Sequence, residues 1–190
     1  GVSIIEREQI DASGAPDLLE LLRLQPGVEL SRTGGGGQQT SVFLRGSNPN
    51  HVLVLIDGVR VASTNTGGFA WEQLPLDAVE RVEIVRGPRA SYWGSDAIGG
   101  VIQIFTRKLT GPRLAARYGS YEDARGDAGY GAWNGDEGFS VQAGLRHVRG
   151  FSSTNPGICS DPNDPYCPYN ADDDGYRSKH LEARGAMHAG

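Results

Sequence analysis

The spacing of hydrophobic residues changes close to residue 110. Upstream of that point, Leu18, Leu21 and Leu22 recur at the three- and four-residue intervals that place side chains on one face of a helix. We therefore predict a helix over residues 15–24. Asp17 falls in its first turn, where a carboxylate interacts favourably with the helix dipole.

Short extended runs predict a small mixed sheet in the same half of the chain. The run from Val52 to Ile56 is apolar at every position, which is typical of a strand that is covered on both faces. Asp57-Gly58 follows it as a turn signal and predicts a hairpin. The predicted strands are 42–45, 52–56, 59–61, 81–85 and 101–105, with a short helical turn at 76–79.

The second half of the chain has a period of two. Phe139, Val141, Ala143 and Leu145 alternate with polar or small residues, and the segments around 114–118 and 123–133 behave similarly. Strands of about ten residues with one apolar face are typical of transmembrane β-barrels. A water-soluble antiparallel sheet has the same alternation, and the period alone favours that second alternative.

Composition excludes several classes of function. The 190 residues carry 18 Lys and Arg against 23 Asp and Glu, a net charge of −5, which argues against a nucleic-acid-binding protein. The 28 glycines fit a chain rich in turns and strands. The sequence contains no HExxH, GxSxG or Cys/His zinc motif, so an enzyme is disfavoured.

Two cysteines, Cys159 and Cys167, flank a polar, proline-containing segment that we predict to be a loop. A disulfide between them would stabilise the fold by roughly 2–3 kcal/mol on loop-entropy grounds. The alternative is a pair of free thiols. We favour the disulfide because exposed free thiols are reactive, and a disulfide implies an oxidising compartment.

Four ordered motifs give the first half a family resemblance: LRG, LIDGVR, IVRGP and YWGSDAIGGVIQI. With the preceding LLRLQPGVEL, they resemble the plug domain of TonB-dependent outer-membrane receptors, and within that family they are most similar to the cobalamin receptors. The resemblance implies an α+β plug domain (a small mixed sheet with short helices) at residues 1–108. It also implies that residues 112–190 are the first strands of an antiparallel transmembrane β-barrel of about twenty-two strands.

The resemblance also implies a function. Such receptors lie in the outer membrane of Gram-negative bacteria, in contact with its lipid, and import cobalamin or another corrinoid. The periplasmic protein TonB drives import by pulling on a short box upstream of the plug, which this chain does not include. The alternative within the family is a siderophore or haem receptor, and a remote alternative is a soluble β-rich enzyme or adhesion module. Because a few strands cannot close a barrel, we interpret the chain as an N-terminal piece of a longer receptor.

Three plug loops correspond to ligand-contacting loops of the cobalamin receptors: residues 33–41, 47–50 and 63–70. The resemblance assigns substrate contacts to Gln39, Ser41, Asn48, Thr66 and Gly67. Hydroxyl and amide groups suit a large neutral ligand with an amide rim, and apart from Arg32 these loops are nearly uncharged. For the glycine-rich segment alone, the alternative is a flexible linker. A phosphate loop is disfavoured because no Lys-Ser/Thr follows the glycines.

An acidic loop provides the candidate metal site. Asn170, Asp172 and Asp174 in NADDDG align with a calcium-binding loop of the cobalamin receptors. Carboxylate and carbonyl oxygens are the ligands that Ca2+ prefers. A further family ligand is replaced by Ser152 here, and Asp161 or Asp164 could substitute for it. A solvated, Asp-rich loop tip is an equally good interpretation of the triplet.

The resemblance implies a second set of roles inside the plug. Arg45, Arg86 and Arg89 would form buried ion pairs between plug and barrel, whereas a solvated charged face is the alternative. The nearby acids that could serve are Asp57, Glu80 and Glu83, with Arg81 as a further cation. Gly99 and Gly100 would allow close backbone approach where the plug packs on the barrel wall.

Overall fold

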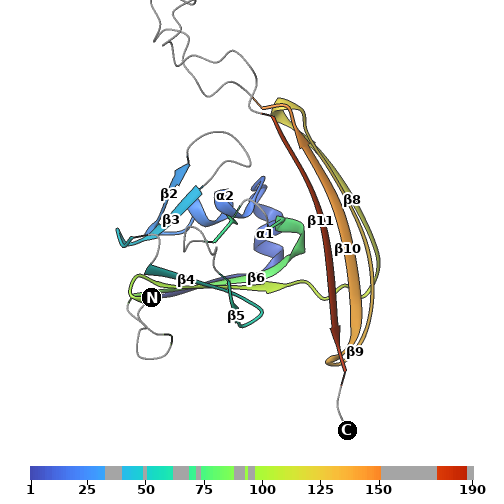
Figure 1. Ribbon diagram of the computed structural model, residues 1–190, viewed down its shortest axis with the longest axis horizontal. Helices are drawn as coiled ribbons and strands as arrows, with labels where there is room; N and C mark the ends of the chain where they lie inside the picture. Colours follow the sequence, from blue (N-terminus) through green and yellow to red (C-terminus); the bar gives the residue numbers. More distant parts are fainter. Residues whose placement is uncertain are drawn as a thin grey trace, which may run out of the picture. The chain divides into compact units, whose positions relative to one another are not determined.

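The computed structural model describes residues 1–32, 40–48, 51–61, 69–71, 74–87, 93, 97–150 and 175–187. Two compact units are present, and the chain passes from the first to the second after Leu109. Figure 1 shows the mixed sheet with its helices in the first unit and the long strands of the second. Among the described residues, no helix has the length and apolar character needed to cross a membrane.

The first unit is built on a five-stranded sheet with the order β1-β6-β7-β4-β5. Strands β4 and β7 run parallel, and the other neighbours are antiparallel. Strands β2 and β3 form a separate antiparallel pair. The bounds are β1 Val2–Ile5, β2 Val28–Arg32, β3 Thr40–Leu44, β4 Val52–Ile56, β5 Val59–Arg60, β6 Val79–Arg86 and β7 Gly100–Thr106.

The helices of this unit are short: α1 Arg7–Ser13, α2 Leu18–Arg23 and the 3-10 turn η3 Leu76–Ala78. The predicted helix over 15–24 is α2. Asp17 is its N-cap rather than a first-turn residue, and its Oδ1 accepts the backbone N–H of Glu20 at 2.9 Å. The sequence did not predict β1, α1 or β2, which contain too few apolar residues at regular spacing for a clear periodic signal.

Strand β4 is buried on both faces, as its unbroken apolar run predicts. Leu53 and Leu55 pack with Ala97 and Val101 in one cluster. Val54, which points to the opposite face, joins the main core between the sheet and the helices. Strand β4 is therefore covered on both sides, and the LIDGVR motif begins near its end.

The side chain of Arg7 connects α1 to η3 and to the start of β6. The residue is only 6% exposed, and its Nη1 donates to the carbonyl oxygens of Leu76 at 3.0 Å and Val79 at 2.5 Å. Its Nε donates to Asp11 Oδ2 at 3.1 Å, which completes an ion pair within the helix. These acceptors offset the cost of burying a cation.

The second unit is one antiparallel sheet with the order β11-β10-β9-β8. The 3-10 turn η5 (Ser120–Glu122) connects the first two strands. Gly135 and Asp136 alone join β9 to β10, whereas residues 149–175 join β10 to β11. The strands are long and bend along their length (Figure 1). Their bounds are β8 Gly111–Gly119, β9 Asp123–Asn134, β10 Glu137–Val148 and β11 Tyr176–Ala186.

The alternation in this sheet is inverted relative to a water-soluble protein. Along β10, Phe139, Val141 and Leu145 are exposed, whereas Ser140 and Gln142 are buried. We call the exposed side the apolar face; across it, cross-strand register aligns Leu114, Ala128, Ala143 and Leu181. The opposite side is the polar face, and it carries Arg113, Arg117, Asp123, Arg125, Asp127, Gln142, Arg146, His180, Glu182 and Arg184.

Apolar residues outside and polar residues inside are the pattern of a membrane barrel strand, and a soluble sheet shows the reverse. The structure therefore favours the barrel alternative over the soluble sheet that period alone would favour. The expected fold class, a mixed α+β plug followed by antiparallel barrel strands, is confirmed.

Candidate functional site

Three of the plug motifs meet at one end of the five-stranded sheet. After β3 the chain turns, and Ser47 N–H donates to the Leu44 carbonyl at 3.0 Å. Gly99 N–H donates to the His51 carbonyl at 2.9 Å, and Gly87 N–H donates to the Gly99 carbonyl at 3.2 Å. Backbone hydrogen bonds therefore connect Gly99 of the IGG segment both to His51 and to Gly87 of the RGP segment, and Ser47, which follows the LRG motif, lies close to Gly99.

Two glycines make this junction possible. A Cβ at Gly99 would lie 2.1 Å from Ser47 Oγ, and a Cβ at Gly100 would lie 2.3 Å from the Val85 carbonyl oxygen. Gly100 also has φ of 149°, a conformation that disfavours other residues. The close approach expected at Gly99 and Gly100 is present, but the contacts lie within the plug unit itself.

Arg45 and Arg86 lie on either side of Gly27. A Cβ at Gly27 would be 3.5 Å from Arg45 Cγ and 3.8 Å from Arg86 Cδ. Arg86 is 9% exposed, and its Nη1 donates to Ser3 Oγ at 2.8 Å. Burial and, secondarily, the charge of Arg45 lower the pKa of Arg86.

The remaining Arg86 donors indicate a missing acceptor. Its Nε and Nη2 are buried and have no hydrogen-bond partner within the part of the chain that the structure describes. Buried guanidinium groups are nearly always hydrogen-bonded. We therefore expect the acceptor to come from residues outside that part.

The acids named as candidate partners make other contacts. Glu83 lies 3.0 Å from Arg81, and Glu80 lies 3.7 Å from Arg107. Asp57 Oδ1 accepts the backbone N–H of Thr106 at 3.0 Å. Among the described residues, Arg81 and Glu83 therefore form one of the expected ion pairs, whereas Arg45 and Arg86 form none with these acids. Arg89 lies outside the described residues.

The predicted ligand-contacting residues are only partly described. Ser41 is half-buried on β3, opposite Ser31 of β2, and Asn48 is exposed in the turn that follows β3. The backbone carbonyl of Asn48 accepts the His51 N–H at 2.9 Å, which leaves its side-chain amide on the surface. Gln39, Thr66 and Gly67 lie outside the described residues.

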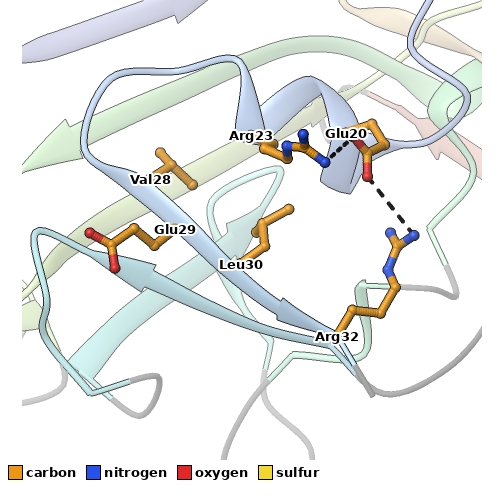
Figure 2. A pocket seen from close by; sticks show the side chains of 6 residues that line it. All are labelled: Glu20, Arg23, Val28, Glu29, Leu30 and Arg32. Carbon is orange, nitrogen blue, oxygen red and sulfur yellow. Dashed lines mark hydrogen bonds and ion pairs between the residues drawn. The ribbon is translucent and has the colours of Figure 1, made fainter. Parts of the chain in front are cut away.

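A shallow hollow of about 540 Å³ opens between α2 and β2. Figure 2 shows Glu20 reaching two arginines there, Arg23 at 3.4 Å and Arg32 at 4.0 Å. Arg32 Nη2 also lies 3.5 Å from Asp17 Oδ2. The charge of Arg32, which precedes the glycine-rich loop, is thus offset by two carboxylates. The lining residues are Glu20, Arg23, Val28, Glu29, Leu30 and Arg32.

The polar face of the barrel sheet holds a second charged cluster. Asp123 Oδ1 accepts from the Nε atoms of Arg125 at 3.0 Å and Arg146 at 3.1 Å. Its Oδ2 accepts from their Nη2 atoms at 2.6 Å and 2.9 Å. Two arginines therefore each donate two hydrogen bonds to one carboxylate, in the bidentate geometry that gives strong ion pairs. Sequence analysis missed this cluster because it joins three residues on two strands through cross-strand register.

The residues of the predicted metal site and disulfide lie outside the described part of the chain. Asn170, Asp172, Asp174, Cys159 and Cys167 all fall within residues 151–174, which are not among the described ranges. Within those ranges, no group of three or more His, Cys, Asp or Glu side chains is arranged to hold a metal ion.

Known proteins resemble both units. The family model of the TonB-dependent Receptor Plug Domain matches residues 1–101. The vitamin B12 transporter BtuB of Photobacterium profundum is 35% identical over 198 residues, which cover 100% of this chain and 30% of that protein. The chain therefore spans about a third of the length of its curated relative.

Solved structures give a consistent result. A ferric enterobactin receptor mutant (PfeA) from Pseudomonas aeruginosa superposes with a TM-score of 0.71 at 26% identity, over 96% of this chain and 30% of that one. The siderophore receptor PirA of the same species gives 0.61 at 27% identity, over 96% and 31%. The yersiniabactin uptake receptor FyuA of Yersinia pestis, at 20% identity, a TM-score of 0.65 and coverages of 98% and 29%, shares the fold.

These relatives are transporters and receptors rather than enzymes. The plug match covers more than half of the chain, and its motifs meet at one structural junction. The chain therefore belongs to the family of TonB-dependent receptors, with the plug domain as its first unit.

Proposed function

We propose that the receptor containing this chain imports cobalamin or a related corrinoid. The observation that carries the proposal is the 35% identity to a vitamin B12 transporter over the whole chain, plug and strands together. Identity to the solved siderophore receptors is lower, at 26% and 27% for PfeA and PirA.

The chemistry of the plug supports a neutral ligand. The two described contact candidates, Ser41 and Asn48, offer a hydroxyl and an amide. Arg32, the one charge beside the glycine-rich loop, is offset by Asp17 and Glu20. A ligand with an amide rim would find donors and acceptors there without an unmatched charge, and Gln39, Thr66 and Gly67 would add further polar contacts.

We propose that the receptor lies in the outer membrane of a Gram-negative bacterium, with lipid against the apolar face. Leu114 and Leu181 on that face are 85% and 76% exposed, which is costly in water and favourable in hydrocarbon. Strands of this length suit a bilayer crossing.

TonB would supply the energy by acting on the plug. The buried Arg86 guanidinium with unmet donors implies a polar contact beyond the described residues. A charge-matched polar interface would let the plug move during transport, whereas an extensive apolar interface would hold it in place.

Calcium remains part of the proposal. Asn170, Asp172 and Asp174 provide amide and carboxylate oxygens, which suit Ca2+. Bound calcium would neutralise the acidic triplet and order the loop in the complete receptor. Isothermal titration calorimetry of the complete receptor with CaCl2 tests this, and the absence of a binding isotherm would remove the calcium site.

A siderophore is the second candidate, and one observation favours it. The polar face carries five arginines, Arg113, Arg117, Arg125, Arg146 and Arg184, against the acids Asp123, Asp127 and Glu182. Anionic iron chelates would be attracted to an excess of positive charge.

Equilibrium binding to the purified complete receptor separates the two candidates. We expect saturable cobalamin binding that ferric enterobactin does not displace, and a several-fold weaker affinity for Asn48→Ala. Asn134→Ala, at the β9–β10 turn, is the matched control and should bind as the parent does. Tight binding of the ferric chelate without cobalamin binding would overturn the proposal.

A further inference from the structure

One end of the apolar face carries a cluster of three basic side chains. His147 on β10 lies directly opposite Arg177 on β11, and Lys179 follows two residues later on the same face. All three side chains are at least partly exposed. We call His147, Arg177 and Lys179 the basic rim.

The basic rim borders the apolar belt. Cross-strand neighbours on this face form rows that run from β8 to β11. The row that ends in Lys179 otherwise contains Ala116, Gly126 and Leu145. The next row toward the Gly135-Asp136 turn contains only apolar residues. The row containing Arg177 adds Tyr118, which is 77% exposed, and Ala124. Neither of the two rows carries an acidic side chain.

Geometry places the three basic side chains within reach of one anion. Facing residues of an antiparallel pair have Cβ atoms about 5 Å apart, and residues two apart on one strand are separated by about 7 Å. These spacings suit the oxygens of a phosphate group. Like charges at such distances repel unless an anion lies between them.

The connections identify which end of the sheet this is. The basic rim lies at the end where residues 149–175 join β10 to β11, while the opposite end has only the Gly135-Asp136 turn. In outer-membrane barrels, long connections are extracellular and short turns are periplasmic. Asp136 and Glu137 lie at the opposite end, whereas at the end of the basic rim the exposed acid Glu122 is paired with Arg149.

We propose that the basic rim binds the phosphate groups of a glycolipid of the lipid A type in the outer leaflet. The basic side chains would meet the phosphates at the headgroup level while the acyl chains cover the apolar belt, and exposed Tyr118 and Tyr121 lie at this same end of the sheet. This inference rests on the proposed membrane location. It adds a lipid-recognition site distinct from the ligand and calcium sites.

The test uses the complete receptor, purified in mild detergent and titrated with diphosphoryl lipid A by native mass spectrometry. The double variant Arg177→Gln with Lys179→Gln should bind at least about tenfold more weakly, because each interfacial cation contributes about fivefold. The matched control, Arg184→Gln, removes one charge from the polar face of the same strand and should bind as the parent does. The charge-preserving variant Arg177→Lys with Lys179→Arg should retain binding.

Further measurements show whether the bound phosphate belongs to a lipid or is free in solution. They also show whether a loss of binding reflects the site or a barrel that has not inserted. Lipid A stripped of its phosphates should bind the parent as weakly as diphosphoryl lipid A binds the double variant. Equal binding of both lipids, equal loss in Arg184→Gln, or displacement by millimolar inorganic phosphate would overturn the site. Heat-modifiable migration of the receptor reports barrel insertion separately. A parent that never inserts contradicts the proposed membrane location, whereas an inserted barrel without lipid A preference contradicts only this inference.

Discussion

The carboxylate of Asp127 and the imidazole of His180 meet across Gly144, with Oδ1 and Nε2 at 3.2 Å. The pair belongs to β9 and β11, which do not neighbour each other, and it spans the intervening strand β10. A Cβ at Gly144 would lie 2.1 Å from both Asp127 Oδ1 and His180 Cε1. Nε2 has no aligned hydrogen bond within the described residues.

Replacing Gly144 therefore tests the contact between Asp127 and His180 across β10. Gly144→Ala should destabilise the receptor by about 2–4 kcal/mol, because the methyl group must displace both members of a largely buried pair. The thermal midpoint of the heat-modifiable gel shift measures the change. Gly126→Ala is the control, since Gly126 lies on the apolar face with no atom within 4 Å of its Cβ position. Equal midpoints for the two variants would contradict the prediction.

Asp123 provides a second prediction. Asp123→Asn should cost about 2–3 kcal/mol, because Arg125 and Arg146 would lose their shared carboxylate at a site where its side chain is only 14% exposed. Urea-induced unfolding followed by far-UV circular dichroism gives the free energy.

The control for Asp123 is the nearby pair of Glu122 and Arg149, whose N–O distance is 3.1 Å. Its side chains are 54% and 63% exposed, so Glu122→Gln should cost less than about 1 kcal/mol. A larger loss for Glu122→Gln than for Asp123→Asn would show that burial does not govern the strength of these pairs.

The plug junction leads to a third prediction. Gly100→Ala should open the plug to limited proteolysis, because its Cβ would collide with the Val85 carbonyl and its φ of 149° is unfavourable for alanine. Gly46→Ala, at a φ of 71° with open space around its Cβ position, should cost only about 1–2 kcal/mol. Mass spectrometry of the released fragments measures both, and unchanged protection in Gly100→Ala would count against the junction.

The fourth prediction concerns ligand charge. Arg32→Gln should change the cobalamin dissociation constant by less than about threefold, because Asp17 and Glu20 already offset the arginine and a neutral ligand gains little from it. Arg23→Gln, in the same hollow, is the control (Figure 2). A loss of tenfold or more confined to Arg32→Gln would instead indicate an anionic ligand.

Local sequence patterns predicted the kind of several elements, although they did not predict the 11-residue strand β11. The leucine spacing predicted α2, the apolar run of β4 predicted a strand covered on both faces, and strict alternation predicted β10. Such periods depend only on neighbours along the chain, so one sequence suffices to find them. The ordered plug motifs likewise identified the family without coordinates.

Only the tertiary structure decided which residues meet. The alternation in β10 fits a soluble sheet as well as a barrel until the exposed side is known, and the exposed side proved to be the apolar one. Arg86 was expected beside an acid, but it lies against Arg45 and donates to Ser3. The Asp127–His180 crossing depends on the register of three strands and on the absence of a side chain at Gly144. Contacts of this kind join positions far apart in the chain, and no local period encodes which distant residue will be the partner.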